Sequence, residues 1–196
     1  YMDTGAMYRA FAWKVMKEGT DLRDEKELKR VLKKTRIELM EHDGHLKIFL
    51  NEVDVTDEIR TPELSQMASR VSTLKIVRER MVEFQRAMGF QGGVVAEGRD
   101  IGTVVFPEAD VKIYLDASSQ ERARRRFEEL KHQGKQVTLE ETLEEMEERD
   151  RRDKERTVAP LCKAEDAIVI DSTHFGVDGV VERIMQEIQS KMPAMQ

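Results

Sequence analysis

Three arginines, Arg149, Arg152 and Arg156, recur at three- and four-residue intervals in a charge-rich segment. At 100° per residue they fall in one band of a helix, with Asp150 and Asp153 on the neighbouring face. A guanidinium group stays charged at any working pH and donates paired hydrogen bonds to phosphate oxygens. The spacing therefore predicts a phosphate clamp, in which Asp153 accepts a hydrogen bond from a ribose hydroxyl or orients an arginine. The alternative is a solvated helix end with internal ion pairs.

A second candidate lies in the segment Glu97 to Thr103, where Arg99 and Asp100 have a glycine on each side. This segment follows the apolar run Val94 to Ala96, which is typical of a buried strand. In open α/β sheets, ligands bind beyond the carboxyl ends of the strands, and flanking glycines permit a sharp turn and a close approach. The pattern favours a ligand site, with a structural turn as the alternative.

Two further arginine positions could reach phosphate. Thr4 opens a predicted helix and Arg9 follows one and a half turns later, an arrangement that can receive an anion, although capping explains Thr4 equally well. In a helix predicted from Ser118 to about His132, three arginines share one side and could reach a second nucleotide: Arg122, Arg125 and Arg126. No Cys/His set has zinc spacing, so we expect no metal ligand from the protein.

The elements that position these residues alternate between short apolar runs and amphipathic segments. Periodicity and caps predict helices at Thr4 to about Lys17, Glu25 to about Lys34, Pro62 to about Ser72, Leu74 to about Met88, Ser118 to about His132, Leu139 to Arg156 and Val177 to about Lys191. Strands are predicted at Val94 to Ala96, Val111 to Leu115 and Ile168 to Ile170. Continuous apolar strands between helices indicate an α/β fold with a parallel sheet covered on both faces.

The stretch from about residue 36 to 90 differs in character. Ile37 to Leu39 and Leu46 to Leu50 flank His42-Asp43-Gly44, and Asp-Gly between apolar runs is a hairpin signal. A short strand from Val53 to Val55 and two helices follow. We expect a small α+β insert with a charged outer face.

Composition limits the class of protein. Of 196 residues, 39% are hydrophobic and 37% are charged, which is typical of a globular protein with a charged surface. No apolar run reaches 18 residues, so we expect no membrane association. The net charge of −6 argues against a nucleic-acid binder that relies on a basic surface. A lone Cys162 favours a reduced, cytoplasmic setting.

In their order along the chain, these motifs resemble the bacterial cytidylate kinases. Four segments carry the resemblance: residues 1–9, 97–107, 111–118 and 149–161. The resemblance covers essentially the whole chain and includes the insert. It implies a P-loop kinase fold that transfers the γ-phosphoryl group of ATP to CMP or dCMP with Mg²⁺. It also implies a core of residues 1–35 and 91–196, a lid at about 132–157, and a nucleoside-monophosphate-binding insert at 36–90.

The resemblance also assigns roles to residues at matching positions. The acceptor's phosphate would be held by Thr4, Arg9, Arg99 and Arg156, and its ribose by Asp153. The cytosine would be read by Ser69, Arg78 and Asp100, with Tyr8 packed nearby. The ATP phosphates would be bound by Arg125, Arg149 and Arg152. The catalytic groups would be Arg99, Arg149, Arg152 and Arg156.

One departure from the family pattern concerns the phosphate-binding loop. No Gly-x-x-x-x-Gly-Lys-Ser/Thr motif occurs in the sequence, and in P-loop enzymes this loop cradles the β and γ phosphates. We expect it to precede Tyr1, and we expect the 196 residues alone to be inactive. We also expect a monomer acting on small molecules. Three alternatives remain: a kinase that acts on UMP and CMP alike or on another small acceptor, a catalytically silent nucleotide-binding module, and a nucleic-acid binder that rests on the arginines alone.

Overall fold

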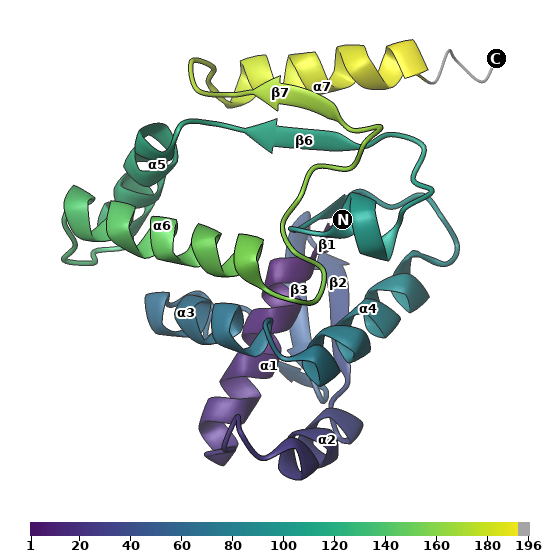
Figure 1. Cartoon of the computed structure of the whole chain (residues 1–196), viewed down its shortest axis with the longest axis vertical. Helices are drawn as coiled ribbons and strands as arrows, with labels where there is room; N and C mark the ends of the chain where they lie inside the picture. Colours follow the sequence, from purple (N-terminus) through teal and green to yellow (C-terminus); the bar gives the residue numbers. More distant parts are fainter. Residues whose placement is uncertain (192–196) are drawn as a thin grey trace.

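The computed structural model describes residues 1–191, and the chain folds into helices packed around three small sheets (Figure 1). The helices are α1 (Thr4–Glu18), α2 (Glu25–Lys33), α3 (Pro62–Val71), α4 (Lys75–Gly89), α5 (Ser119–His132), α6 (Leu139–Glu155) and α7 (Val177–Lys191). The strands are β1 (Met2–Asp3), β2 (Ile37–His42), β3 (His45–Leu50), β4 (Val53–Asp54), β5 (Ala96–Glu97), β6 (Ile113–Asp116) and β7 (Ile168–Asp171). All seven predicted helices are confirmed, with ends within about two residues, a shift that fraying alone can produce.

Helix α1 runs through the centre of the main hydrophobic core. Its predicted stripe of Met7, Phe11 and Val15 is buried, and α1 contacts α3, α4 and β3. The same core takes in apolar residues of α2, the β2–β3 hairpin, α3 and α4. The helix ends at Gly19, whose positive φ of 64° suits the left-handed C-cap conformation. Residues on both sides of position 36 thus share one core.

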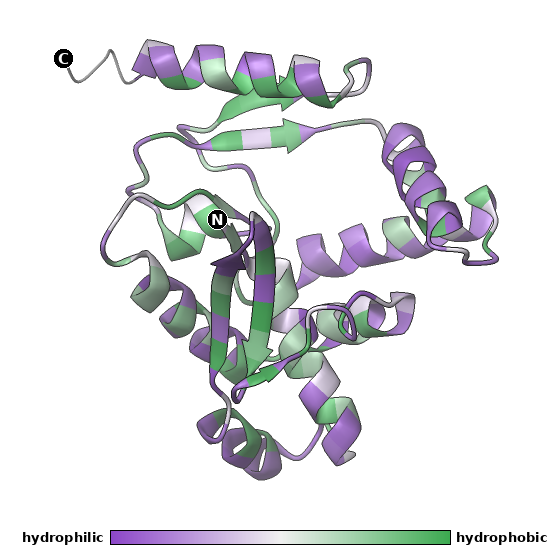
Figure 2. Ribbon diagram, turned by 180° about the vertical axis from the view of Figure 1, so that it is seen from behind, coloured by the Kyte–Doolittle hydropathy of each residue, from purple (hydrophilic) through white to green (hydrophobic). Residues whose placement is uncertain are grey.

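The predicted hairpin is confirmed. Strands β2 and β3 pair antiparallel, with His42 opposite His45. Asp43 and Gly44 between them have φ angles of 52° and 74°, the pair of positive values that a two-residue type I′ turn requires. Figure 2 shows both hydrophobic and hydrophilic residues along β2 and β3. One face of the hairpin packs on the core and the other meets solvent.

The parallel strands are present, but they form two separate pairs. β1 pairs with β5 and β6 pairs with β7, and within residues 1–191 no strand pairing joins the two. The expectation of one sheet covered on both faces is therefore not met. Val95, Leu115 and Val169 are more than half exposed, and α7 lies along one side of the β6–β7 pair (Figures 1 and 2). The α/β class is confirmed, whereas the expected buried strand before Glu97 is largely exposed.

A π-helix, η1 (Ile101–Val105), follows Asp100 and was not predicted. The backbone N–H groups of Val104 and Val105 both donate to the Asp100 carbonyl, at 2.9 and 3.2 Å. Such short π-helical turns occur frequently at functional sites. Among residues 1–191, no helix is both long enough and apolar enough to cross a membrane.

Candidate functional site

Two buried carboxylates, Asp100 and Asp153, hold together elements that are distant in sequence. Arg78 of α4 donates from Nη1 to Asp100 Oδ2 at 2.6 Å. Arg156, the C-cap of α6, places Nη2 3.6 Å from Asp100 Oδ1 and Nη1 3.5 Å from Asp153 Oδ1. The Arg156 Nε also donates to the Ala159 carbonyl at 2.6 Å, which fixes the guanidinium plane. The loop after β5 is thereby joined to α4 and α6.

Arg99 and Arg149 approach the other side of Asp153. The Arg99 Nε donates to Asp153 Oδ2 at 3.2 Å, and the Arg149 Nε lies 4.0 Å from the same oxygen. Four guanidinium groups therefore share two carboxylates, which gives the cluster an excess of two positive charges. Burying unpaired charge is costly, so this cluster is poised to receive an anion.

Three buried polar atoms of these elements have no hydrogen-bond partner within the described part of the chain: Ser69 Oγ, Arg149 Nε and Arg156 Nη2. Burial, followed by the charge of Arg99, lowers the pKa of Arg149 to about 10, although the side chain as a whole is 37% exposed. Burial, followed by the charge of Arg78, also lowers the pKa of Arg156. Burial is the main cause of both shifts, and an anion bound beside these groups would oppose it by favouring their charged forms.

Tyr8 of α1 packs beside this cluster. Its ring faces the Arg78 guanidinium at 5.4 Å from the ring centroid, and burial raises the pKa of Tyr8 to about 12. The neutral phenol provides an apolar wall and a polarisable face for the arginine. Arg78 Nε also donates to the Ser72 carbonyl at 3.0 Å, so the end of α3, which carries Ser69, is tied to the same group.

Thr4 and Arg9 lie at the start of α1. Asp3, rather than Thr4, is the N-cap: its Oδ1 accepts from the Ala6 N–H at 2.8 Å, and its Oδ2 pairs with Arg9 Nη2 at 2.9 Å. Thr4 Oγ1 instead donates to the Glu97 carbonyl at 2.6 Å, which brings the end of β5 against α1. Arg9 is close enough for its charge to contribute to the lowered pKa of Arg149.

Gly98, next to Glu97, permits this approach because it has no side chain. A Cβ on Gly98 would lie 2.4 Å from Thr4 Oγ1. Gly98 is not among the glycines with a positive φ, so glycine is needed here for space and not for backbone conformation. The sequence predicted a close approach at this position. The close partner in the structure is the protein itself, at Thr4.

A family model described as cytidylate kinase matches residues 1–190. The chain belongs to this family. The cytidylate kinase of Carboxydothermus hydrogenoformans is 48% identical over 191 residues, which cover 97% of this chain and 86% of the relative. That of Bacillus subtilis is 47% identical over 191 residues, covering 97% and 85%, and that of Bacillus pumilus is 49% identical over 185 residues, covering 94% and 82%.

Within this member of the cytidylate kinase family, the structure brings most predicted site residues together. One set surrounds or adjoins the two carboxylates: Tyr8, Arg9, Arg78, Arg99, Arg149 and Arg156. Arg152 lies on α6, like Arg149, but donates from Nη2 to Gln66 Oε1 of α3 at 2.6 Å. Gln66 was not predicted, although its spacing of three residues from Ser69 places both on one helical face.

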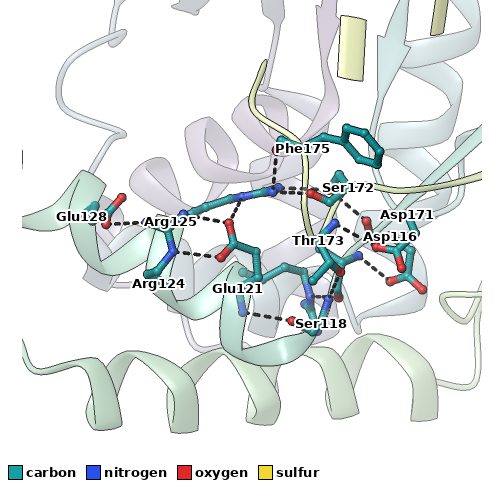
Figure 3. Close-up of polar contacts among 12 residues, drawn as sticks. Asp116, Ser118, Glu121, Arg124, Arg125, Glu128, Asp171, Ser172, Thr173 and Phe175 are labelled. Atoms are coloured by element: carbon teal, nitrogen blue, oxygen red, sulfur yellow. Dashed lines mark hydrogen bonds and ion pairs between the residues drawn. The ribbon is translucent and has the colours of Figure 1, made fainter. Parts of the chain in front are cut away.

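Arg125 lies outside the cluster, in a separate polar network (Figure 3). It donates to Glu121 Oε1 at 2.8 Å, to Ser172 Oγ at 3.0 Å, and to the carbonyls of Ser172 and Phe175 at 2.6 and 3.2 Å. These contacts join α5 to the segment after β7. Arg122 and Arg126 likewise have carboxylate partners, Asp150 at 2.5 Å and Glu129 at 2.7 Å.

The described residues do not form a metal centre. No group of three His, Cys, Asp or Glu side chains within residues 1–191 is arranged to hold a metal ion. Asp100 and Asp153 face arginines rather than an open coordination site. The residues described therefore do not fit a Mg²⁺ ion held by protein side chains.

Proposed function

We propose that this protein transfers the γ-phosphoryl group of ATP to CMP or dCMP and so forms CDP or dCDP. The supporting observation is the buried cluster around Asp100 and Asp153, with its two unbalanced positive charges and its unpartnered donors. A nucleoside monophosphate supplies an anion and a polar base edge together. Relatives covering nearly the whole chain carry the name cytidylate kinase, which supports this choice of base.

In the proposal, the cytosine binds between α3 and α4. Its exocyclic amine donates to Asp100, and its ring nitrogen and carbonyl oxygen accept from Arg78 and Ser69. The Ser69 hydroxyl has no other partner within residues 1–191, and a carboxylate oxygen keeps a second lone pair when Arg78 occupies the first. UMP offers a carbonyl where CMP offers the amine, and that carbonyl would face the Asp100 carboxylate without a proton between them.

The acceptor phosphate is proposed to bind the part of the cluster around Asp153. Thr4, Arg9, Arg99 and Arg156 take the phosphate, while Asp153 accepts from the ribose hydroxyl. Phosphoryl transfer requires mainly positioning and charge neutralisation. The phosphate of CMP is already an anionic nucleophile, so the proposal assigns no general base. Arg149 and Arg152 contact the ATP phosphates, and Arg152 must leave Gln66 to do so.

The donor side needs one part that these 196 residues lack. P-loop kinases cradle the β and γ phosphates in a Gly-rich loop, and no such motif occurs in this sequence. We therefore propose that the 196-residue chain binds CMP without turning it over. Mg²⁺ would accompany ATP. The core, lid and insert boundaries, the role of Arg125, the monomeric state and the cytoplasmic location stay predictions.

The test is a comparison of ligands by isothermal titration calorimetry. We expect CMP to bind the 196-residue chain at least about tenfold more tightly than UMP, because one lost charge-assisted hydrogen bond is worth about that much. Equal affinities would overturn the base assignment. CDP formation from ATP and CMP is then assayed with the product of the full open reading frame, where binding without CDP would indicate a silent module. CDP formation by the 196 residues alone would contradict the requirement for the loop.

The phosphate assignment is tested by Arg99→Ala in the product of the full open reading frame. We expect a loss of about 2–4 kcal/mol in transition-state stabilisation, measured as kcat/KM for CMP. Arg70→Ala, an exposed arginine of α3, is the matched control. A near-normal kcat/KM in Arg99→Ala would remove the phosphate clamp.

A further inference from the structure

Arg86 lies on α4, eight residues after Arg78, and it contacts none of the proposed ligand-binding groups. Its Nη2 donates to the Val104 carbonyl at 2.6 Å and its Nε donates to the Val105 carbonyl at 3.1 Å. These carbonyls belong to the last residues of η1, where the helix leaves them without intrahelical partners. Arg86 therefore caps the carboxyl end of the π-helix from a neighbouring element.

The π-helix carries this contact to Asp100. The N–H groups of Val104 and Val105 donate to the Asp100 backbone carbonyl, while the Asp100 side chain accepts from Arg78 at 2.6 Å. A closed ring results, in which α4 holds the backbone of η1 through Arg86 and the Asp100 carboxylate through Arg78. The two arginines are about 12 Å apart along the helix at 1.5 Å per residue.

A third contact supports the same pair of elements. Gly89, at the end of α4, packs so closely on Phe106 that an added Cβ would lie 2.4 Å from Phe106 Cζ. Phe106 in turn donates from its N–H to the Ile101 carbonyl at 2.7 Å, at the start of η1. The end of α4 therefore holds η1 and the residue after it in two ways, through the Arg86 guanidinium group and through the packing of Gly89 on Phe106.

We infer that Arg86 is a positioning residue for base recognition: by clamping η1 to α4, it sets the Asp100 carboxylate and the Arg78 guanidinium at the spacing that reads the base. The inference rests on the proposed function of Asp100 and Arg78. A ring with two attachment points restricts how Asp100 can move. Of the arginines that would bind phosphate, Arg9 lies on α1, and Arg99 and Arg156 each contact the Asp153 carboxylate. Arg86 thus affects base recognition more than it affects the phosphate contacts.

The experiment compares CMP with D-ribose 5-phosphate, which has the sugar and the phosphate but no base. Both are titrated calorimetrically into the wild-type chain, Arg86→Met, Arg86→Lys and Gly89→Ala. The control is Arg80→Met on the same helix, where Arg80 pairs with Glu83 and stacks on Phe84. We expect Arg86→Met and Gly89→Ala to weaken CMP binding about tenfold and to leave ribose 5-phosphate within about twofold. Arg86→Lys, which keeps a donor, should recover part of the CMP affinity.

Several outcomes would overturn the inference. If both ligands weaken together in Arg86→Met, its role is general stability; if neither weakens, Arg86 does not position the site. Should Arg86→Met fail to fold, Gly89→Ala decides by the same comparison. If the wild-type chain binds CMP no better than ribose 5-phosphate, the proposed function of Asp100 and Arg78 fails first, and the inference fails with it.

Discussion

At Arg149 and Arg156, guanidinium nitrogens are buried without a hydrogen-bond acceptor among residues 1–191. Such groups reduce stability, because desolvation is not repaid by a partner. Arg156 still gains from two carboxylates and from the Ala159 carbonyl. Among residues 1–191, Arg149 has one ion-pair partner, Asp153 at 4.0 Å, and the repulsion of Arg99 acts against it. At the scale of single residues, a substitution of Arg149 should thus distinguish an effect on binding from an effect on stability most clearly.

We expect Arg149→Met to leave the free energy of unfolding unchanged or raised, while the affinity for CMP or for ATP phosphates falls. The reason is the lowered pKa of Arg149: the native state disfavours its charge, and methionine keeps much of the apolar stem. Urea unfolding and calorimetric titration measure the two effects. Arg151→Met, on the exposed side of α6, is the control and should change neither. A clear loss of stability in Arg149→Met would mean that Arg149 is a structural ion-pair partner.

At the scale of elements, the site depends on how closely the end of β5 approaches α1. Thr4 Oγ1 reaches the Glu97 carbonyl at 2.6 Å, and Gly98 leaves room for that contact. This contact fixes the backbone just before Arg99 and Asp100, whose side chains belong to the cluster. A shift here moves two predicted ligand-binding groups together.

Gly98→Ala is expected to lower stability by about 1–3 kcal/mol, the usual cost of overpacking, and to weaken CMP binding. The added Cβ would meet Thr4 Oγ1 at 2.4 Å and Ile101 Cδ1 at 2.9 Å, so the loop or α1 must move. Thermal unfolding and calorimetry measure both changes. Gly176→Ala is the matched control, because a Cβ there meets nothing within 4 Å. The same affinity in Gly98→Ala and the wild type would show that the close approach is unimportant to the site.

At the scale of the whole molecule, burial is uneven. Nine residues of α1 are buried, seven of them in the main hydrophobic core, whereas none in α7, Val177–Lys191, is buried. Helix α7 contacts β7, and the β6–β7 pair presents exposed Leu115 and Val169. Local opening is easiest where few apolar contacts must break.

Rates of native-state hydrogen exchange should therefore differ between α7 and the helices of the main core. We expect amides of α7 to exchange at least about tenfold faster than those of α1, because α7 opens without disturbing the main core. Helix α4, which buries Val77 and Met81, is the internal control and should resemble α1. Mass spectrometry of peptic fragments resolves these helices. Equal protection in α7 and α1 would show that the two regions unfold as one unit.

Local features were predictable because their causes lie within a few residues. The stripe Met7, Phe11 and Val15 follows the helical period, and Asp43-Gly44 provides the two positive φ angles of the hairpin turn. The pairing of the parallel strands and the π-helix after Asp100 could not be predicted in this way. Pairing depends on residues far apart in sequence, and η1 is held partly by Arg86 from another element.

The sequence by itself determined the residue types of the candidate site, the helices that carry them and the family resemblance, because periodicity, caps and motifs are written along the chain. Only the tertiary structure decided which arginines share a cluster. Arg99 and Arg149 both reach Asp153, whereas Arg125, also on a charged helix, is taken up by Glu121 and the segment after β7. A guanidinium group binds whichever acceptors the fold places within its reach, and that placement depends on how distant elements pack.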